Sequence, residues 1–150
     1  MSTLVHNRRA RFDFEILDEL EAGLVLAGHE VKAIRKGKAK LESSYVVVRG
    51  GEAYLVGASI APYQPVNTPR EYDRERPRKL LLSRKELDKL ERATEQERQT
   101  AVPLSLYEKG RTLKLCLALA RGKKKADKRE SIKARDVGRD IERETKFKMR

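Results

Sequence analysis

A chain of 150 residues with 35 Lys and Arg against 23 Asp and Glu carries a formal charge of +12, which is typical of proteins that bind polyanions. This length suits one domain with its own core plus an appendage and leaves little room for a second full domain. No apolar run approaches the roughly 20 residues needed to span a bilayer, and the N-terminus lacks a secretory apolar segment.

Nucleic acid is therefore the expected partner, and an anionic membrane surface is the alternative that the charge alone leaves open. The absence of a spanning or secretory segment favours a cytoplasmic protein without a membrane partner. Cys116 is the only cysteine, so the sequence predicts no disulfide framework and no cysteine metal site. Its position within an apolar run predicts a small buried side chain.

The N-terminal half reads mostly as strands. Phe12, Phe14 and Ile16 alternate with charged residues, as in a half-buried strand, and an apolar stretch over 20–27 continues it after a bulge expected at 21–23. A short helix is predicted over 30–36, because Val31 and Ile34 are three residues apart and a glycine follows.

A hairpin is predicted for the β-branched and aromatic runs 45–48 and 53–56, because Gly50 and Gly51 between them suit a tight turn. Strand character continues to residue 61. Four prolines then mark a long loop over 62–78.

The remaining part of the packed region predicts a helix and a second hairpin. Ser83 and Glu86 form a capping-box pattern, which places a helix from residue 84 to about 97. Residues 101–107 and 111–120 predict two strands joined by a short turn, with Pro103 at an edge or a bulge.

About six strands, two or three short helices and no alternation of strands with helices predict a mainly β fold. We expect a small closed or partly open antiparallel barrel of OB type formed by residues 1–121. Residues 122–150 contain 12 Lys and Arg against 6 Asp and Glu and few large apolar side chains. They predict a basic C-terminal tail that is disordered when free and orders on a polyanion, with a conditional helix over 131–146.

Catalytic patterns are missing from the sequence. His6 and His29 belong to no nucleophile or zinc pattern, and the glycines at 50 and 51 lie between strands rather than before a helix. Asp18, Glu19 and Glu21 read as solvated charge. We expect no catalytic residue, no metal and no cofactor, and therefore no enzyme.

Two basic clusters in the packed region point to RNA. The first contains Asn7, Arg8, Arg9 and Arg11, and the second contains Arg76, Arg78 and Lys79. Guanidinium groups match phosphate geometry, although each cluster alone can be a solubilising surface. Tyrosines are scattered and tryptophan is absent, which favours recognition of the shape and backbone of a folded RNA over stacking on single bases.

Several segments occur together in a distinctive order: 7–11, 21–24, 30–32, 60–62, 78–82, 102–104, 120–124 and 127–129. With these segments the chain resembles the bacterial SsrA-binding protein (SmpB) family from residue 7 almost to its end. The resemblance implies an adaptor without catalytic activity that acts in trans-translation, the rescue of stalled ribosomes. Its implied partners are transfer-messenger RNA and the ribosome, and we expect a monomer.

In this family the barrel binds the tRNA-like domain of transfer-messenger RNA at its D-loop and elbow and stands in for the missing anticodon arm. The tail enters the vacant mRNA channel of the small subunit, next to the decoding centre, and becomes helical there. The resemblance and the basic clusters together give an RNA-binding set: Asn7, Arg8, Arg9, Arg11, Glu21, Arg78, Lys79, Leu81 and Lys114. The resemblance gives a ribosome-contacting set at the start of the tail: Gly122, Lys123, Lys124, Asp127, Lys128 and Arg129.

Two of these residues have a second interpretation. Glu21 can accept hydrogen bonds from base or 2′-hydroxyl donors, or it can be a solvated bulge residue. Leu81 can contact RNA or belong to the core. Ala126 departs from the aromatic or His residue that many relatives carry there. The alternative functions are a general nucleic-acid-coating protein with a polycationic tail and, less favoured, a nucleic-acid enzyme.

Overall fold

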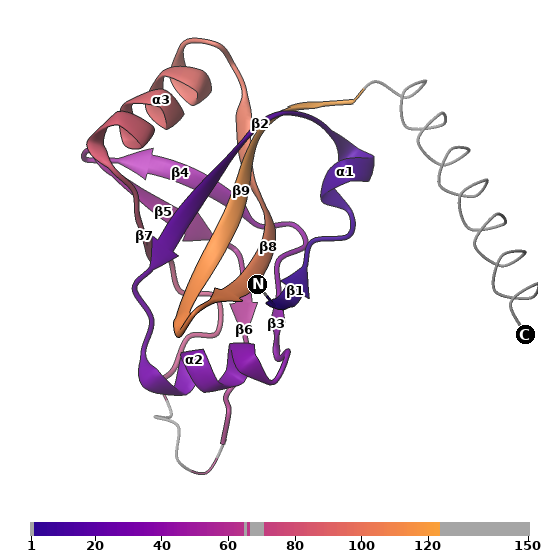
Figure 1. Ribbon diagram of the computed structural model, residues 1–150, viewed down its shortest axis with the longest axis vertical. Coiled ribbons are helices and arrows are strands. Elements are labelled where there is room, and N and C mark those ends of the chain that lie inside the picture. Colours follow the sequence, from indigo (N-terminus) through magenta and orange to yellow (C-terminus); the bar gives the residue numbers. More distant parts are fainter. Residues whose placement is uncertain (1, 65, 67–70, 124–150) are drawn as a thin grey trace, which may run out of the picture.

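The computed structural model describes residues 2–64, 66 and 71–123 (Figure 1). The predicted disorder of the tail from residue 124 on, the conditional helix over 131–146 and the predicted contacts of Lys124, Asp127, Lys128 and Arg129 lie outside these residues. Gly122, which was assigned to the disordered tail, instead belongs to a strand. The described strands are β1 (Ser2–His6), β2 (Phe14–Leu24), β3 (Ala39–Lys40), β4 (Tyr45–Arg49), β5 (Glu52–Val56), β6 (Ser59–Ile60), β7 (Arg78–Leu81), β8 (Thr100–Lys109) and β9 (Thr112–Gly122). The described helices are α1 (Ala10–Asp13), α2 (Gly28–Arg35) and α3 (Arg84–Glu95).

Six strands close into a ring through antiparallel pairs. Their order is β8-β4-β5-β7-β2-β9, and β9 pairs back onto β8. The other edge of β8 is shared between β4, which pairs at Ala101, and β1, which pairs over 105–108. The mainly β fold and the closed antiparallel arrangement predicted from the sequence are confirmed.

The three helices take different places around the ring. In Figure 1, α3 lies across one end of the ring and α2 lies at the other end. Leu90 and Ala93 of α3 and Ala33 and Ile34 of α2 are buried in the main apolar cluster. The helix α1 instead packs on the outside of the sheet, where Ala10 is buried.

Strand β9 divides the apolar residues between two faces. Leu115, Leu117 and Leu119 belong to the main cluster inside the ring, while Ala118 and Ala120 belong to a second, smaller cluster beneath α1. Because successive strand residues point to opposite faces, this alternation defines an inner and an outer face for the strands next to β9.

A bulge at Leu17 shifts the pairing of β2. Ile16 lies opposite Ala120, but Asp18 lies opposite Leu119, so Leu17 is the extra residue. The bulge predicted at 21–23 is wrong, because those residues pair regularly with 116, 115 and 114 of β9. Phe12 is also not in a strand as predicted, because α1 forms there and β2 starts at Phe14.

The predicted glycine turn and capping box are both confirmed. Gly50 and Gly51 have φ of +58° and +75° in the β4–β5 turn, values that glycine adopts without steric cost. The Ser83 hydroxyl accepts from the Glu86 amide at 3.2 Å, and the Glu86 carboxylate accepts from the Ser83 amide at 3.1 Å. The helices predicted over 30–36 and 84–97 and the two predicted hairpins are confirmed, with boundaries that differ by a few residues.

The short or charged strands were missed. The sequence pattern predicted no strand at β1 or β3, and Arg78 was expected in a loop although β7 begins there. Gly57, with φ of +85°, ends β5 before the short strand β6. Strand β9 also continues past the predicted end at residue 120, because Arg121 and Gly122 pair with the start of β2. Cys116 is only half-buried.

Arg78 is fully buried, so its predicted contact with RNA is corrected to a structural role. Its guanidinium binds Glu30 Oε2 from Nη2 at 2.6 Å and from Nε at 3.1 Å. It also donates to the carbonyls of Ala58 at 2.8 Å and Arg74 at 2.9 Å. A buried charge is tolerated only when it is paired and hydrogen-bonded. Arg78 lies in a run of charged residues that is typical of a surface segment, so its burial is not evident from the sequence.

Glu30 is the acidic partner and is itself 0% exposed. It accepts from the Ala27 amide at 3.0 Å, which caps α2, and it also pairs with Arg76. The Tyr72 hydroxyl lies 3.1 Å from its second oxygen. Burial alone would raise the pKa of Glu30, but the hydrogen bonds from Ala27, Arg78 and Arg76 outweigh it and lower the pKa to about 2.

The substitution Glu30→Gln keeps the side-chain shape but leaves Arg78 buried without a counter-charge. We expect the free energy of unfolding at pH 7 to fall by about 3–5 kcal/mol in urea denaturation. The exposed Glu15→Gln is the matched control and should stay within about 0.5 kcal/mol of the parent.

The same pair predicts a loss of stability in acid. Because the folded-state pKa of Glu30 lies below its ordinary value of 4.5, its contribution is complete above pH 4.5 and disappears as the pH falls toward 2. Urea denaturation between pH 7 and pH 2 should therefore show the parent and Glu30→Gln converging in stability. A difference that stays constant over this range would contradict the assignment.

Candidate nucleic-acid interface

Four strands bring three of the predicted RNA-binding residues, Glu21, Leu81 and Lys114, into one line on the outer face. Lys114 of β9 lies opposite Tyr107 of β8 on one side and Gly23 of β2 on the other, and Gly23 lies opposite Leu81 of β7. Glu21 is two residues before Gly23 and points to the same face. We call Glu21, Gly23, Leu81, Tyr107 and Lys114 the outer row.

Leu81 is a surface residue and not part of the core. Its side chain is 53% exposed and lies over Gly23, where an added Cβ would come within 3.3 Å of Leu81 Cβ. The glycine therefore leaves the space into which the leucine leans. An exposed leucine beside charged groups is available to pack against a partner.

Glu21 is held in its ionised form by its neighbours. The Tyr107 hydroxyl donates to Glu21 Oε2, and Lys109 Nζ lies 3.4 Å from Glu21 Oε1. The Tyr107 hydrogen bond is the main cause that lowers the pKa of Glu21, and Lys109 and Lys114 contribute. A carboxylate has about four acceptor positions, so Glu21 can still accept donors from an RNA. Glu21 thus has hydrogen-bond partners on β8 and lies in a regularly paired part of β2, unlike the solvated bulge residue considered above.

The line continues onto the next strand through Lys79. This residue faces outward two positions before Leu81 and lies opposite Tyr54 of β5. Lys79 Nζ binds Glu52 Oε1 at 2.9 Å, and the Tyr54 hydroxyl donates to Glu52 Oε2 at 2.9 Å. The Lys79 hydrogen bond is the main cause that lowers the pKa of Glu52. Lys79 thus lies beside the outer row, whereas Arg78 points inward.

The N-terminal basic cluster lies further along the same face. Arg11 binds Glu19 Oε1 at 3.1 Å, and Glu19 is two residues before Glu21 on β2. Arg9 lies 3.4 Å from Asp13 and stacks 5.1 Å above the Phe12 ring. Arg8, Arg9 and Arg11 are all exposed. Exposed ion pairs of this kind are weak, so the guanidinium groups can exchange their partners for phosphate.

Asn7 faces inward and anchors the cluster. Its Nδ2 donates to the Pro103 carbonyl at 2.8 Å, and its amide donates to the Leu104 carbonyl at 2.8 Å. These bonds fix the start of α1 against β8. The structure therefore places Asn7 as a support for the neighbouring arginines.

The chain leaves the ring beside this cluster. Gly122 pairs with Phe14, and the Lys123 amide donates to the Asp13 carbonyl at 3.0 Å. Lys123 Nζ donates to the Arg11 carbonyl at 2.8 Å. A groove of about 560 Å³ lies between α1 and the end of β9, and its lining includes Arg9 together with Gly122 and Lys123. The first two residues of the predicted ribosome-contacting set thus adjoin the predicted RNA-binding cluster.

Sequence reasoning missed Tyr107 and Lys109 as members of this site. Both lie on β8, and their relevance comes from the contact with Glu21, which is 86 residues away from Tyr107 in the chain. The pairing of β8 with β9 was predicted as a hairpin, and its register opposite Lys114 is the signal that could have identified Tyr107.

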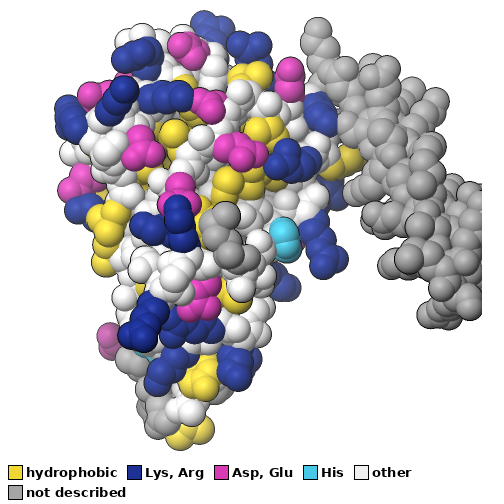
Figure 2. Space-filling view, viewed as in Figure 1, with side chains coloured by type: hydrophobic (Ala, Val, Ile, Leu, Met, Phe, Trp, Pro, Cys, Tyr) yellow, Lys and Arg dark blue, Asp and Glu magenta, His cyan; other side chains and the backbone are white. Residues whose placement is uncertain are grey.

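In Figure 2, Lys and Arg side chains are spread over the visible face with Asp and Glu among them, and they are dense over α3. Within 2–64, 66 and 71–123, no group of three or more His, Cys, Asp and Glu side chains is arranged to hold a metal ion. Among these same residues, no helix combines the length and apolar character needed to cross a membrane.

Comparisons with known proteins agree with one another. A family model described as SmpB protein matches residues 4–147. The chain is 47% identical over 151 residues to the SsrA-binding protein of Rubrobacter xylanophilus, covering 100% of this chain and 99% of that protein. It is 50% identical over 141 residues to the SsrA-binding protein of Chelativorans sp., covering 93% and 90%.

Among solved structures, the chain is similar to one described as "tmRNA-SmpB: a journey to the center of the bacterial ribosome". The TM-score is 0.67 and the sequence identity is 43%, covering 85% of this chain and 92% of that chain.

The geometry around Glu21 predicts the effect of Tyr107→Phe. Removing the hydroxyl while keeping the ring should raise the pKa of Glu21 toward its ordinary value of 4.5, which NMR titration of the side-chain carboxyl carbon can measure. Tyr54→Phe is the matched control, because it removes a donor from Glu52 and should raise the pKa of that group only. An unchanged Glu21 titration in Tyr107→Phe would show that the hydrogen bond is unimportant.

Proposed function

The chain belongs to the SmpB protein family, and from this membership we propose that it is an adaptor that binds the tRNA-like domain of transfer-messenger RNA and delivers it to stalled ribosomes. The observation that carries the proposal is the match of the family model to residues 4–147, nearly the whole chain. The proteins to which the chain is similar are named for binding SsrA, and the similar structure concerns the bacterial ribosome.

The outer row supports this function through its mixed chemistry. Lys114 and Lys79 can bind phosphates, Glu21 can accept from 2′-hydroxyl groups or base donors, and Leu81 can pack against a sugar or base. All five residues of the row lie on paired strands of a closed ring, which hold these groups at fixed spacing. This arrangement suits a folded RNA of defined shape.

The finer parts of the proposal rest on the family and the sequence. The protein acts in the cytoplasm as a monomer and catalyses no reaction. Residues 1–121 form the RNA-binding unit, and the basic segment 122–150 enters the vacant mRNA channel near the decoding centre. The composition of that segment supports the last step, because it gives 12 Lys and Arg against 6 Asp and Glu for contact with ribosomal RNA.

RNA binding should depend on the outer row. We expect Leu81→Ala to weaken binding of a tRNA-like-domain transcript about tenfold, because burying a leucine side chain contributes about 1.5–3 kcal/mol. Filter binding at fixed salt measures this loss. Leu17→Ala is the matched control, because Leu17 is 39% exposed on the inner face and should leave affinity unchanged.

Lys114→Ala tests the electrostatic part separately. It should weaken binding and reduce the slope of log affinity against log salt by about 1, the effect of losing one phosphate contact. Lys36→Ala, an exposed lysine after α2, is the control. Equal affinity of the parent chain for an unrelated RNA duplex of the same length would overturn the proposed function in favour of general coating of nucleic acid.

The tail has its own test. Replacing Asp127, Lys128 and Arg129 by Ala, with compensating lysines added nearby, should abolish ribosome rescue in a reconstituted translation assay and leave transcript binding unchanged. A tail that acts only as a polycation would keep full rescue activity in this variant.

A further inference from the structure

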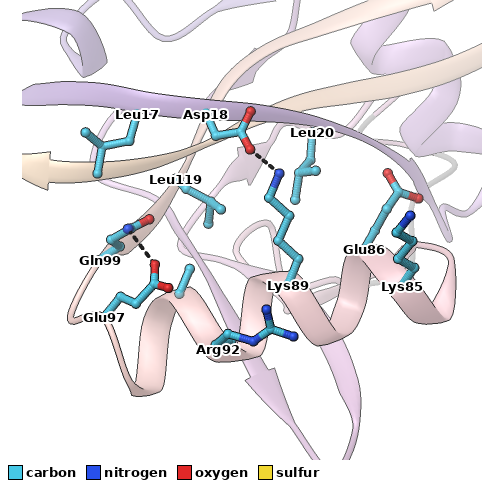
Figure 3. A pocket seen from close by; sticks show the side chains of 11 residues that line it. Leu17, Asp18, Leu20, Lys85, Glu86, Lys89, Arg92, Glu97, Gln99 and Leu119 are labelled. Carbon is cyan, nitrogen blue, oxygen red and sulfur yellow. Dashed lines mark hydrogen bonds and ion pairs between the residues drawn. The ribbon is translucent and has the colours of Figure 1, made fainter.

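A second surface lies on the inner-face side of β2, away from the outer row. A groove of about 550 Å³ separates β2 from α3, and Figure 3 shows Leu17, Leu20 and Leu119 directed toward the helix across it. Glu19 and Glu21 of the same strand face the opposite side. We call this space the α3 groove. The RNA binding proposed for the outer row does not involve the α3 groove.

The floor of the α3 groove is aliphatic. Leu17, Leu20 and Leu119 come from the sheet and Ala93 comes from α3. The bulge explains the exposed member: Leu17 is the extra residue of β2, it turns to the same side as Asp18, and it remains 39% exposed. The bulge thus adds an apolar side chain at the rim of the core, and the described residues leave it partly uncovered.

The carboxylates around the groove are already engaged. Lys89 reaches from α3 to Asp18 on β2 and is the main cause that lowers the pKa of Asp18 (Figure 3). Glu86 caps its own helix, and Glu97 accepts from Gln99 Nε2 at 2.9 Å.

The cations are only partly engaged. Lys85 and Arg92 are exposed on α3, and among the described residues neither forms an ion pair. Lys89 is half-exposed, and an exposed ion pair contributes about 0–1 kcal/mol, so it can release Asp18 for a new partner at small cost. The groove therefore offers a leucine floor beneath cations that can bind incoming carboxylates.

We propose that the α3 groove binds an acidic segment of a protein partner, in which carboxylates flank an aliphatic side chain. The aliphatic side chain packs on Leu17, Leu20 and Leu119, and the carboxylates bind Lys85, Lys89 and Arg92. This pairing is the helix-in-groove or extended-peptide type of recognition, in which a buried anchor supplies affinity and flanking charges supply orientation.

Charge and lining favour this occupant over three others. The segment 124–150 of this chain has 11 Lys and Arg against 6 Asp and Glu, and a second copy of the chain carries +12, so neither offers the excess of carboxylates that Lys85 and Arg92 would bind. RNA phosphates could bind the cations, but RNA bases could not stack on the floor of the groove, because none of the residues that line it is aromatic.

The test is selection of peptides from a random library displayed on phage, using the full chain as the target. A parallel selection uses the double charge reversal Lys85→Glu with Arg92→Glu. We expect the parent to enrich peptides that combine Asp or Glu with Leu or Ile. A synthetic copy of an enriched peptide should bind the double variant and Leu17→Ala at least tenfold more weakly, and Leu81→Ala equally well.

Two controls separate this result from misfolding and from RNA binding. Transcript affinity should be unchanged in the double variant and in the milder pair Lys85→Gln with Arg92→Gln, which shows that each chain is folded and that the outer row is intact. No enrichment over the charge-reversed target would overturn the proposal. If the same variants lost binding to a random-sequence oligoribonucleotide, the proposal would be overturned and the groove assigned to RNA. If they lost concentration-dependent self-association, it would be overturned and the groove assigned to a second copy of the chain.

Discussion

Arg78 and Glu30 lie 48 residues apart in the chain and form a buried ion pair on which the placement of β7 depends. Successive residues of a strand face opposite sides, so a slip of one position would turn Arg78 to solvent and bring Lys79 and Leu81 inward. Such a slip would leave Glu30 buried without its partner, which is far more costly than most surface changes. The pair therefore fixes which residues of β7 join the outer row.

A second constraint is the bulge at Leu17, which separates two surfaces on one strand. Before it, Phe14 and Ile16 pack beneath α1 on the outer face. After it, Glu19 and Glu21 share that face while Leu20 joins the main core. The extra residue lets a single strand contribute Glu21 to the outer row and Leu17 and Leu20 to the α3 groove. The two surfaces can then hold different partners at the same time.

Local patterns in the sequence correctly predicted those structural features that depend only on residues close together in the chain. The capping box of α3, the glycine turn of the first hairpin and the pairing of β8 with β9 follow from signals a few residues long. The burial of Arg78 could not be found this way, because it lies in a run of charges that reads as surface and its partner is on α2. Similarly, the exposed position of Leu81 depends on Gly23, to which only the fold brings it close.

The order in which the ring closes has a consequence for synthesis of the protein. Strand β9 is the last described strand, and it pairs with both β2 and β8. A growing chain therefore cannot assemble the line from Tyr107 to Leu81 until β9 has emerged from the exit tunnel. Nascent fragments that end before this strand therefore lack Lys114 and the two strand pairings that complete the outer row.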